Sequence, residues 1–322
     1  MSTRALWLIP AALVVMIIVL AGLYTSRRPM NTPGSDEHVT IDVVPVPLNP
    51  ADPTATALGD FRYAGGLALR SRQTDLLHEL SDIIVSADGS FVAVGDEGTE
   101  LTARIVLDAT GRLAGITDAS VTRLSGQDGR PLTGDNADAE GLTLLPTGDR
   151  LVSFETGPRI WLYPRDGGPP RAVPSPPAPA PANASFEALA ADPAAGADSY
   201  IVGSEDSGRT WACRVSSPCV AGPAVDKPGE FGLVSMNRLP DGMTAVLLRA
   251  YDPVRRNRVT LTILRGTSEL ARLYLAPPLT VDNFEGVAWT PGPHGGYRFY
   301  LISDDNSRAT QRTLLLAFDW RN

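Results

Sequence analysis

The sequence predicts an all-β protein, a β-propeller of five or six four-stranded blades that follows an N-terminal hydrophobic segment. Short apolar runs of strand length alternate with turns rich in Gly, Asp and Pro along most of the chain. One hairpin design also recurs, with an acidic residue before its first strand and another after its second strand. Its copies begin 43 to 58 residues apart, a period that suits one propeller blade.

The clearest copy of this hairpin begins at Glu140. Residues 141–145 and 150–154 are apolar enough to form two strands, and residues 146–149, Pro-Thr-Gly-Asp, predict a tight turn between them. In an antiparallel hairpin, the residue that enters the first strand lies at the same end as the residue that leaves the second. Glu140 and Glu155 are therefore expected to approach each other.

Further copies place more acidic residues at equivalent hairpin ends. Three begin at Asp82, Glu187 and Glu285, and a weaker one begins at Glu230 and ends with the cation of Arg249. If the blades surround a common axis, these ends meet on one face of the molecule. The acidic residues that we expect to gather there are Asp96, Glu97, Glu140, Glu155, Glu187, Glu205, Asp206, Glu285, Asp304 and Asp305.

Residues 1–30 are separate from the predicted fold. An almost wholly apolar run from Leu6 to Tyr24 follows Arg4 and precedes Arg27 and Arg28, which is typical of a signal peptide or a membrane anchor. The run is long enough to span a bilayer, and small residues near its end allow cleavage, so both alternatives stay open. In either case we expect an exported protein, periplasmic or extracellular, which residues 6–24 anchor to the membrane if they are not removed.

The rest of the chain divides into a linker and a propeller domain. Residues 31–60 are rich in Pro, Asp and Thr and predict a linker that can add an edge strand. Residues 61–322 predict the propeller, and the strand candidate at residues 61–70 is placed to complete its last blade. The N-terminal 50 residues leave room for a sixth blade. The five clear blades are expected at residues 82–124, 138–163, 186–220, 231–275 and 284–320.

Charge and cysteine content narrow the classes of partner. Residues 31–322 contain 25 basic and 36 acidic residues, a net charge of −11. We therefore do not expect this part of the chain to bind nucleic acid, because phosphate contacts need clustered cations. Its negative charge attracts cations instead. The only cysteines, Cys213 and Cys219, predict a small disulfide loop in an oxidising compartment; they are a weak zinc site because no histidine lies near them in the sequence.

Two motif pairs carry a resemblance to a known family. Asp138-x-Glu140-Gly141 with Ser-Phe-Glu155, and Asn283-Phe-Glu-Gly286 with Ser-Asp-Asp-Asn306, resemble the phytase-like family described by the esterase-like activity of phytase. The resemblance covers about residues 61–320, although residues 80–83 read Leu-Ser-Asp-Ile where the family usually has Gly-Leu-Ser. It implies a propeller and, through a more distant similarity to β-propeller phytases, calcium-assisted hydrolysis of a phosphoester.

The acidic face has a chemistry that agrees with this implication. Carboxylates that approach within a few ångströms need protonation, arginine partners or a bound cation. Ca²⁺ suits such a site because it takes about 6–8 oxygen ligands in irregular geometry. All ten acidic residues named above are therefore candidate metal ligands, and Glu140 and Glu285 are the candidate catalytic carboxylates. Candidate arginine clamps for a small anionic substrate are Arg62, Arg104, Arg159, Arg209 and Arg249.

Other readings of the same residues stay open. Acidic residues beside glycine at strand ends commonly cap turns or pair with arginines. No Gly-x-Ser-x-Gly motif supports a nucleophile-elbow esterase, and His38, His78 and His294 give little support for a Ser-His-Asp site. Whether the protein is an enzyme is therefore left open, with hydrolysis of a phosphate or carboxylic ester as the expectation. The alternatives are a non-catalytic propeller that binds a ligand or protein partner in the cell envelope, and a calcium-stabilised structural module.

Overall fold

The computed structural model describes residues 37–178 and 185–321. The expected signal peptide or membrane anchor at residues 1–30 lies outside these residues. Residues Gly34–Asn322 form one compact unit, and its described part contains 23 strands and two short 3-10 helices, Gly134–Asn136 and Pro240–Gly242. No helix in this part of the chain has the length and hydrophobicity that a bilayer span requires.

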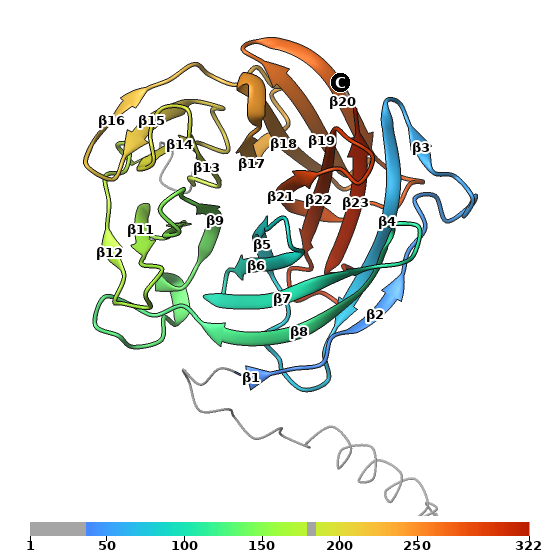
Figure 1. The fold of residues 1–322 in the computed structure, drawn as a ribbon, viewed down its shortest axis with the longest axis horizontal. Helices are drawn as coiled ribbons and strands as arrows, with labels where there is room; N and C mark the ends of the chain where they lie inside the picture. The colour runs from blue at the N-terminus through green and yellow to red at the C-terminus, as the bar shows by residue number, and fades with distance from the viewer. Residues whose placement is uncertain (1–36, 179–184, 322) are drawn as a thin grey trace, which may run out of the picture. The chain divides into compact units, whose positions relative to one another are not determined.

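The strands form five antiparallel sheets, and each sheet contains the four strands of one propeller blade (Figure 1). The all-β propeller fold is therefore confirmed, with five blades among the described residues. Blade 1 consists of β5 (Leu80–Val85), β6 (Ser90–Gly95), β7 (Thr99–Leu107) and β8 (Leu113–Arg123); blade 2 of β9 (Ala139–Leu144), β10 (Arg150–Phe154), β11 (Arg159–Tyr163) and β12 (Arg171–Ala172); blade 3 of β13 (Ala188–Ala191), β14 (Ser199–Gly203), β15 (Thr210–Arg214) and β16 (Ser217–Ala221). Blade 4 consists of β17 (Gly232–Arg238), β18 (Met243–Asp252), β19 (Arg256–Arg265) and β20 (Ser268–Leu275); blade 5 of β21 (Asn283–Pro291), β22 (Tyr297–Asp304), β23 (Leu314–Trp320) and β4 (Phe61–Arg70).

The ring closes through the N-terminal strand β4. This strand pairs antiparallel with β23 along most of its length, so the two ends of the propeller sequence share blade 5. Residues 37–58 carry three short strands: β1 (Glu37–His38) pairs with β8, whereas β2 (Asp42–Pro45) and β3 (Ala57–Leu58) pair with β4. Because chain-terminal strands are otherwise free to fray, this pairing holds the ring together.

Hydrophobic layers between neighbouring blades form the core. Within each blade the strands run antiparallel. Middle strands such as β18, β19 and β22 are buried along most of their length, so both sheet faces contribute apolar side chains to the adjacent layers. The layer between blades 4 and 5 is the largest and includes Phe284, Phe299 and Phe318. The layer between blades 3 and 4 is the smallest of the five. Inner strands β5, β9, β13, β17 and β21 each contact the inner strand of the next blade, so they surround a common centre.

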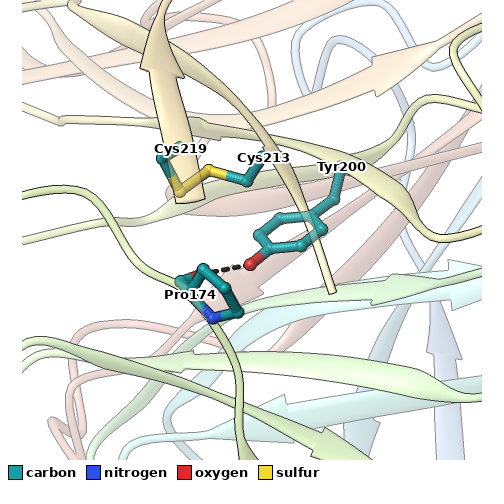
Figure 2. Close-up of a disulfide and its surroundings, with 4 residues drawn as sticks. All are labelled: Pro174, Tyr200, Cys213 and Cys219. Atoms are coloured by element: carbon teal, nitrogen blue, oxygen red, sulfur yellow. Dashed lines mark hydrogen bonds between the residues drawn. A yellow bond between two sulfur atoms is a disulfide. The ribbon is translucent and has the colours of Figure 1, made fainter. Parts of the chain in front are cut away.

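Blade 3 carries the disulfide. Cys213 on β15 and Cys219 on β16 are joined across the hairpin, with their Cα atoms 4.1 Å apart. Figure 2 shows Tyr200 beside this bond, where its hydroxyl donates a hydrogen bond to the carbonyl oxygen of Pro174. Cys213 is buried in the layer between blades 2 and 3, so the disulfide links the short outer strand of blade 3 to its core.

Candidate functional site

The hairpin registers bring the acidic ends together at the inner strands. In blade 2, Ala139 lies opposite Phe154, and in blade 5, Asn283 lies opposite Asp304. Both inner strands contain a β-bulge at the glutamate, because Glu140 and Glu285 fall where the register shifts. A bulge changes the direction of a side chain and is common next to functional sites. The bulges therefore place these two glutamates differently from a regular strand residue.

The glycine after each glutamate lets the neighbouring blade approach closely. A Cβ atom on Gly141 would lie 2.4 Å from the carbonyl oxygen of Glu187, and one on Gly286 would lie 2.7 Å from the Cα atom of Asp82. Real Cβ atoms do not approach other atoms so closely. The Glu-Gly pair thus combines an acidic group with a backbone that can pack tightly at the centre.

Asp82 lies one residue after the position equivalent to Glu140, because the register shift of blade 1 falls at Ser81, and it is a structural acid. Its carboxylate is 1% exposed and accepts hydrogen bonds from the backbone N–H groups of Ile83, at 2.9 Å, and Leu142, at 2.8 Å. It also accepts one from the hydroxyl of Ser235, at 3.1 Å. Burial raises the pKa of Asp82 well above its ordinary value, and these hydrogen bonds oppose the rise. The side chain links blades 1, 2 and 4 below the acidic face.

The blade 4 repeat begins in a different register from the one that we expected. A count back from the turn glycines Gly148 and Gly242 places Val234, and not Glu230, at the position of Glu140. The side chain of Glu230 is 47% exposed and pairs with Arg255 and Arg258. The prediction that Glu230 leads an equivalent hairpin is therefore wrong, because β17 begins two residues later, at Gly232.

One half of the acidic centre surrounds Arg249. Its guanidinium lies 2.9 Å from a carboxylate oxygen of Glu285 and 3.3 Å from one of Glu205, and it donates a 2.6 Å hydrogen bond to Asn283. Burial by itself would lower the pKa of Arg249, but Glu285, Glu187 and Glu205 raise it more. Arg249 therefore stays charged and neutralises part of the cluster.

Asn283 and the Ser185 hydroxyl complete this half. Asn283 donates from Nδ2 to Glu285, at 2.9 Å, and to Asp304, at 2.8 Å. The hydroxyl of Ser185 donates a 2.9 Å hydrogen bond to Glu187. The pKa values of Glu187 and Glu285 nevertheless lie well above the ordinary value, mainly because of burial. Neighbouring acids add to the rise and Arg249 opposes it.

The other half of the centre forms no salt bridge with an arginine among the described residues. One carboxylate oxygen from each of Asp96, Asp138 and Glu140 lies within 4.8 Å of the others. Burial, followed by repulsion from Glu187, Asp96 and Glu285, raises the pKa of Glu140 well above its ordinary value. Burial also raises the pKa of Asp96 to about 7 and that of Asp138 to about 8. A carboxyl–carboxyl hydrogen bond with Glu155 adds to the rise at Asp138.

These three carboxylates fit a divalent cation. They are hard oxygen donors on two adjacent inner hairpins, and their mutual repulsion is what a cation relieves. Asp138 was not among the metal ligands that we expected, although it lies in the Asp-x-Glu motif. The available signal was its place at the hairpin end, because Asp138 is paired through its backbone with Glu155, the residue expected to meet Glu140.

The other expected acidic ligands lie at the edge of the centre or in its loops. Glu155 contacts Asp138 as described above. Glu97 lies 3.3 Å from Arg123 and 3.9 Å from His78. Asp305 caps a loop by accepting hydrogen bonds from the N–H groups of Glu79 and Ser307. Asp206 is exposed.

The five expected arginines do not lie together. Only Arg249 is in the acidic centre. Arg159 lies beside it, stacked 4.2 Å from the ring centroid of Phe154 and within electrostatic range of Asp138. Arg209 is an exposed residue of the blade 3 loop. Arg104 pairs with Asp88 in the hairpin turn of blade 1, and Arg62 lines a cavity with His294, in the turn of the blade 5 hairpin. Arg62 and Arg104 are thus at the turn ends, opposite the acidic ends.

The fold and this site define a five-bladed β-propeller with an acidic centre built from its inner hairpin ends. A family model described as phytase-like, esterase-like activity of phytase, matches residues 76–307. Because this match covers well over half of the chain, the protein belongs to the phytase-like family. No curated protein matches the sequence.

Two solved structures illustrate the similarity to other proteins. A catalytically inactive virginiamycin B lyase from Staphylococcus aureus is 12% identical with a TM-score of 0.44, over 88% of this chain and 100% of the lyase. A protein provisionally assigned as a gluconolactonase is 12% identical with a TM-score of 0.46, over 92% of this chain and 97% of that chain.

Proposed function

We propose that the protein is a hydrolase of a phosphate ester or a related ester, and that it works with a divalent cation at the acidic centre. The observation that carries the proposal is the division of this centre into two halves. The carboxylates of Asp96, Asp138 and Glu140 converge and form no salt bridge with an arginine among the described residues, whereas Arg249 contacts Glu285 directly at 2.9 Å. The half without a salt-bridged arginine is suited to bind a cation, and this cation could in turn bind an anionic group of a substrate.

Asp96, Asp138 and Glu140 would hold the ion, and Ca²⁺ is the expected one because every donor is an oxygen. When bound, such a cation would polarise a phosphoryl oxygen and favour ionisation of a water molecule. The chain's own groups would orient the reaction. Arg249 and Asn283 hold one oxygen of Glu285 in place. Burial raises the pKa of this glutamate well above its ordinary value, which suits a group that accepts a proton during the reaction.

Arg159 supports the binding of an anionic substrate beside the centre. Its guanidinium donates to the backbone carbonyl oxygens of Thr156, at 2.6 Å, and Asn136, at 2.5 Å, and it stacks on Phe154. A guanidinium held in this way keeps its charge and some of its donors. Arg249, by contrast, is already surrounded by acceptors, so we assign it to positioning Glu285.

The expected location supports the same proposal. We infer that the protein is exported, periplasmic or extracellular, and stays at the membrane if residues 6–24 are not cleaved. The Cys213–Cys219 disulfide is consistent with an oxidising compartment. Fractionation of cells that produce the full chain, followed by mass determination of its N-terminus, tests both the compartment and the cleavage.

The decisive experiment joins stability with turnover. The full-length protein is unfolded by heat with calcium and with a chelator, and the same samples are assayed against a panel of phosphate esters and carboxylic esters. The proposal predicts a higher midpoint with calcium and a metal-dependent turnover that Glu140→Gln and Glu285→Gln both abolish. Unchanged midpoints together with no turnover on any substrate would exclude it.

A non-catalytic propeller is the second candidate function, and one observation favours it. Arg249, Asn283, Glu205 and Glu285 already satisfy one another, as in a structural network. A scaffold of this kind would bind a ligand or protein partner in the cell envelope without turnover. A calcium-dependent midpoint without hydrolysis of any substrate would favour this candidate, or a calcium-stabilised structural module, over the hydrolase.

A further inference from the structure

A cavity lies between blades 3 and 4. Its volume is about 740 Å³, and none of its lining residues belongs to the acidic centre. It arises because blade 3 is shorter than blade 4: the strands of blade 3 have four or five residues, whereas β18 and β19 have ten each. The longer sheet extends past the shorter one, so the apolar layer between them leaves space. Cavities of this volume are typical of small-molecule sites.

The cavity has one apolar wall and one line of polar groups. Phe231, Met236, Val246 and Leu248 provide the apolar side. Arg258, Thr260 and Thr262 alternate along β19, and alternate residues of a strand face the same side. No side-chain hydrogen bond of either threonine is found within the described part of the chain. A ligand here would meet a mostly apolar surface with a few donors at defined positions.

Arg258 contains a buried donor without a partner. The residue is 5% exposed, and its guanidinium lies 5.3 Å from the ring centroid of Phe231. One terminal nitrogen lies 3.2 Å from Glu230 and the other 3.2 Å from Asp252. Its Nε has no hydrogen-bond partner among the described residues. Buried donors are nearly always paired, so this one points to an acceptor that a bound molecule can supply.

The charges around the cavity indicate a neutral molecule. Arg258 already faces two carboxylates, and the other arginines of the lining are also paired: Arg238 with Asp192, Arg255 with Glu230 and Asp252, and Arg272 with Glu269. An anion would therefore be repelled by Glu230. A cation would find only one unpaired carboxylate in the lining, that of Asp226, which is exposed. A carbonyl oxygen accepts a hydrogen bond without adding charge.

We propose that the cavity between blades 3 and 4 binds a neutral, largely apolar small molecule whose carbonyl oxygen accepts a hydrogen bond from Nε of Arg258. The hydroxyl groups of Thr260 and Thr262 lie along the same face and add polar contacts. This site is independent of the hydrolase proposed above, since it uses no residue of the acidic centre.

Three probes with the same octyl chain test the proposal on the full-length protein: N-octylacetamide, octanoate and octylammonium. Calorimetric titration should show saturable binding of the amide, and binding about tenfold weaker for each charged probe. Arg258→Lys keeps a cation beside Glu230 and Asp252 but deletes the Nε donor, so it should weaken amide binding about tenfold. Arg104→Lys, an exposed arginine paired with Asp88, is the matched control and should leave the amide affinity unchanged.

A second variant keeps the test valid if Arg258→Lys does not fold. Ala212 is exposed and lines the opposite wall, so Ala212→Trp fills the cavity without disturbing a buried residue and should abolish amide binding. Equal amide affinity in Ala212→Trp and the unmodified protein would overturn the location. Tighter binding of octanoate than of the amide, or no binding of the amide at all, would overturn the chemistry.

Discussion

At the scale of residues, Glu140 and Glu285 occupy equivalent hairpin positions but have different partners. Glu285 contacts Arg249 and Asn283 directly, whereas Glu140 forms no salt bridge in the described part of the chain and interacts with Arg249 only at longer range. The neighbours of Glu140 are acids, and with burial they raise its pKa. The same residue type can therefore serve as a positioned proton acceptor at one place and as a cation ligand at the other.

Replacing Glu140 with glutamine should stabilise the metal-free protein. The substitution keeps the shape of the side chain and removes a charge that burial and neighbouring acids disfavour, so we expect the thermal midpoint to rise by a few degrees. The same variant should lose the calcium-dependent shift and, if the protein is a hydrolase, about 100-fold or more in turnover.

Glu230→Gln is the control for this charge removal. Two arginines pair with Glu230, and the hydrogen bonds to its carboxylate lower its pKa, so neutralising it should not stabilise the protein. A fall in the midpoint of metal-free Glu140→Gln, measured by differential scanning calorimetry beside Glu230→Gln, would contradict the description of Glu140 as an uncompensated acid.

Asp82→Ala should destabilise the protein although it removes an acid from the same region. The substitution leaves the N–H groups of Ile83 and Leu142 and the hydroxyl of Ser235 without their acceptor. We expect a loss of about 2–4 kcal/mol in the free energy of unfolding, measured by urea titration. Asp128→Ala, at an exposed turn, should change it by less than about 1 kcal/mol. Equal effects of the two substitutions would exclude the linking role of Asp82.

At the scale of elements, the inner hairpins depend on tight packing at the Glu-Gly pairs. Gly141→Ala places a methyl group 2.4 Å from the carbonyl oxygen of Glu187, so blade 3 must shift. We expect a loss of about 1–3 kcal/mol in unfolding free energy, seen as a lower urea midpoint. Gly229→Ala is the control, since its added methyl group meets no atom within 4 Å. If Gly141→Ala is as stable as Gly229→Ala, the close approach of the blades is not required.

The elements were largely predictable from the sequence, and the positions of individual side chains were less so. Apolar runs with Asp-Gly or Pro-x-Gly turns identify the hairpins, and Phe61–Arg70 was recognisable as the closing strand. The register of blade 4 was not, because Val234 stands where the other repeats have Ser or Glu, and Glu230 provided a false signal nearby. Arg62 and Arg104, two of the candidate clamps, lie at the turn ends of their blades and away from the acidic centre, a placement that the residue pattern around them did not indicate.

At the scale of the whole molecule, the ring geometry concentrates negative charge at its centre and makes stability depend on pH. Every blade contributes its inner strand, so carboxylates distant in the sequence share one environment. The pKa of Asp96 is raised to about 7 and that of Asp138 to about 8, both from an ordinary value of 3.8. Between these values the folded state binds more protons than the unfolded state, and stability therefore falls as the pH rises.

The metal-free protein should accordingly be more stable at pH 5.5 than at pH 8. The carboxylates whose pKa is lowered, such as Asp88 and Asp252, are ionised in both folded and unfolded states throughout this range, so they do not oppose the trend. If the proposed Ca²⁺ site exists, calcium should reverse this trend, because the ion would bind the ionised carboxylates. The calcium-dependent rise in midpoint should then be larger at pH 8 than at pH 5.5. Thermal unfolding at both pH values, with calcium and with chelator, measures all four cases. Asp138→Asn should reduce the difference between the metal-free midpoints at pH 5.5 and pH 8. A metal-free midpoint that is higher at pH 8 would show that the acidic centre does not control the pH dependence of stability.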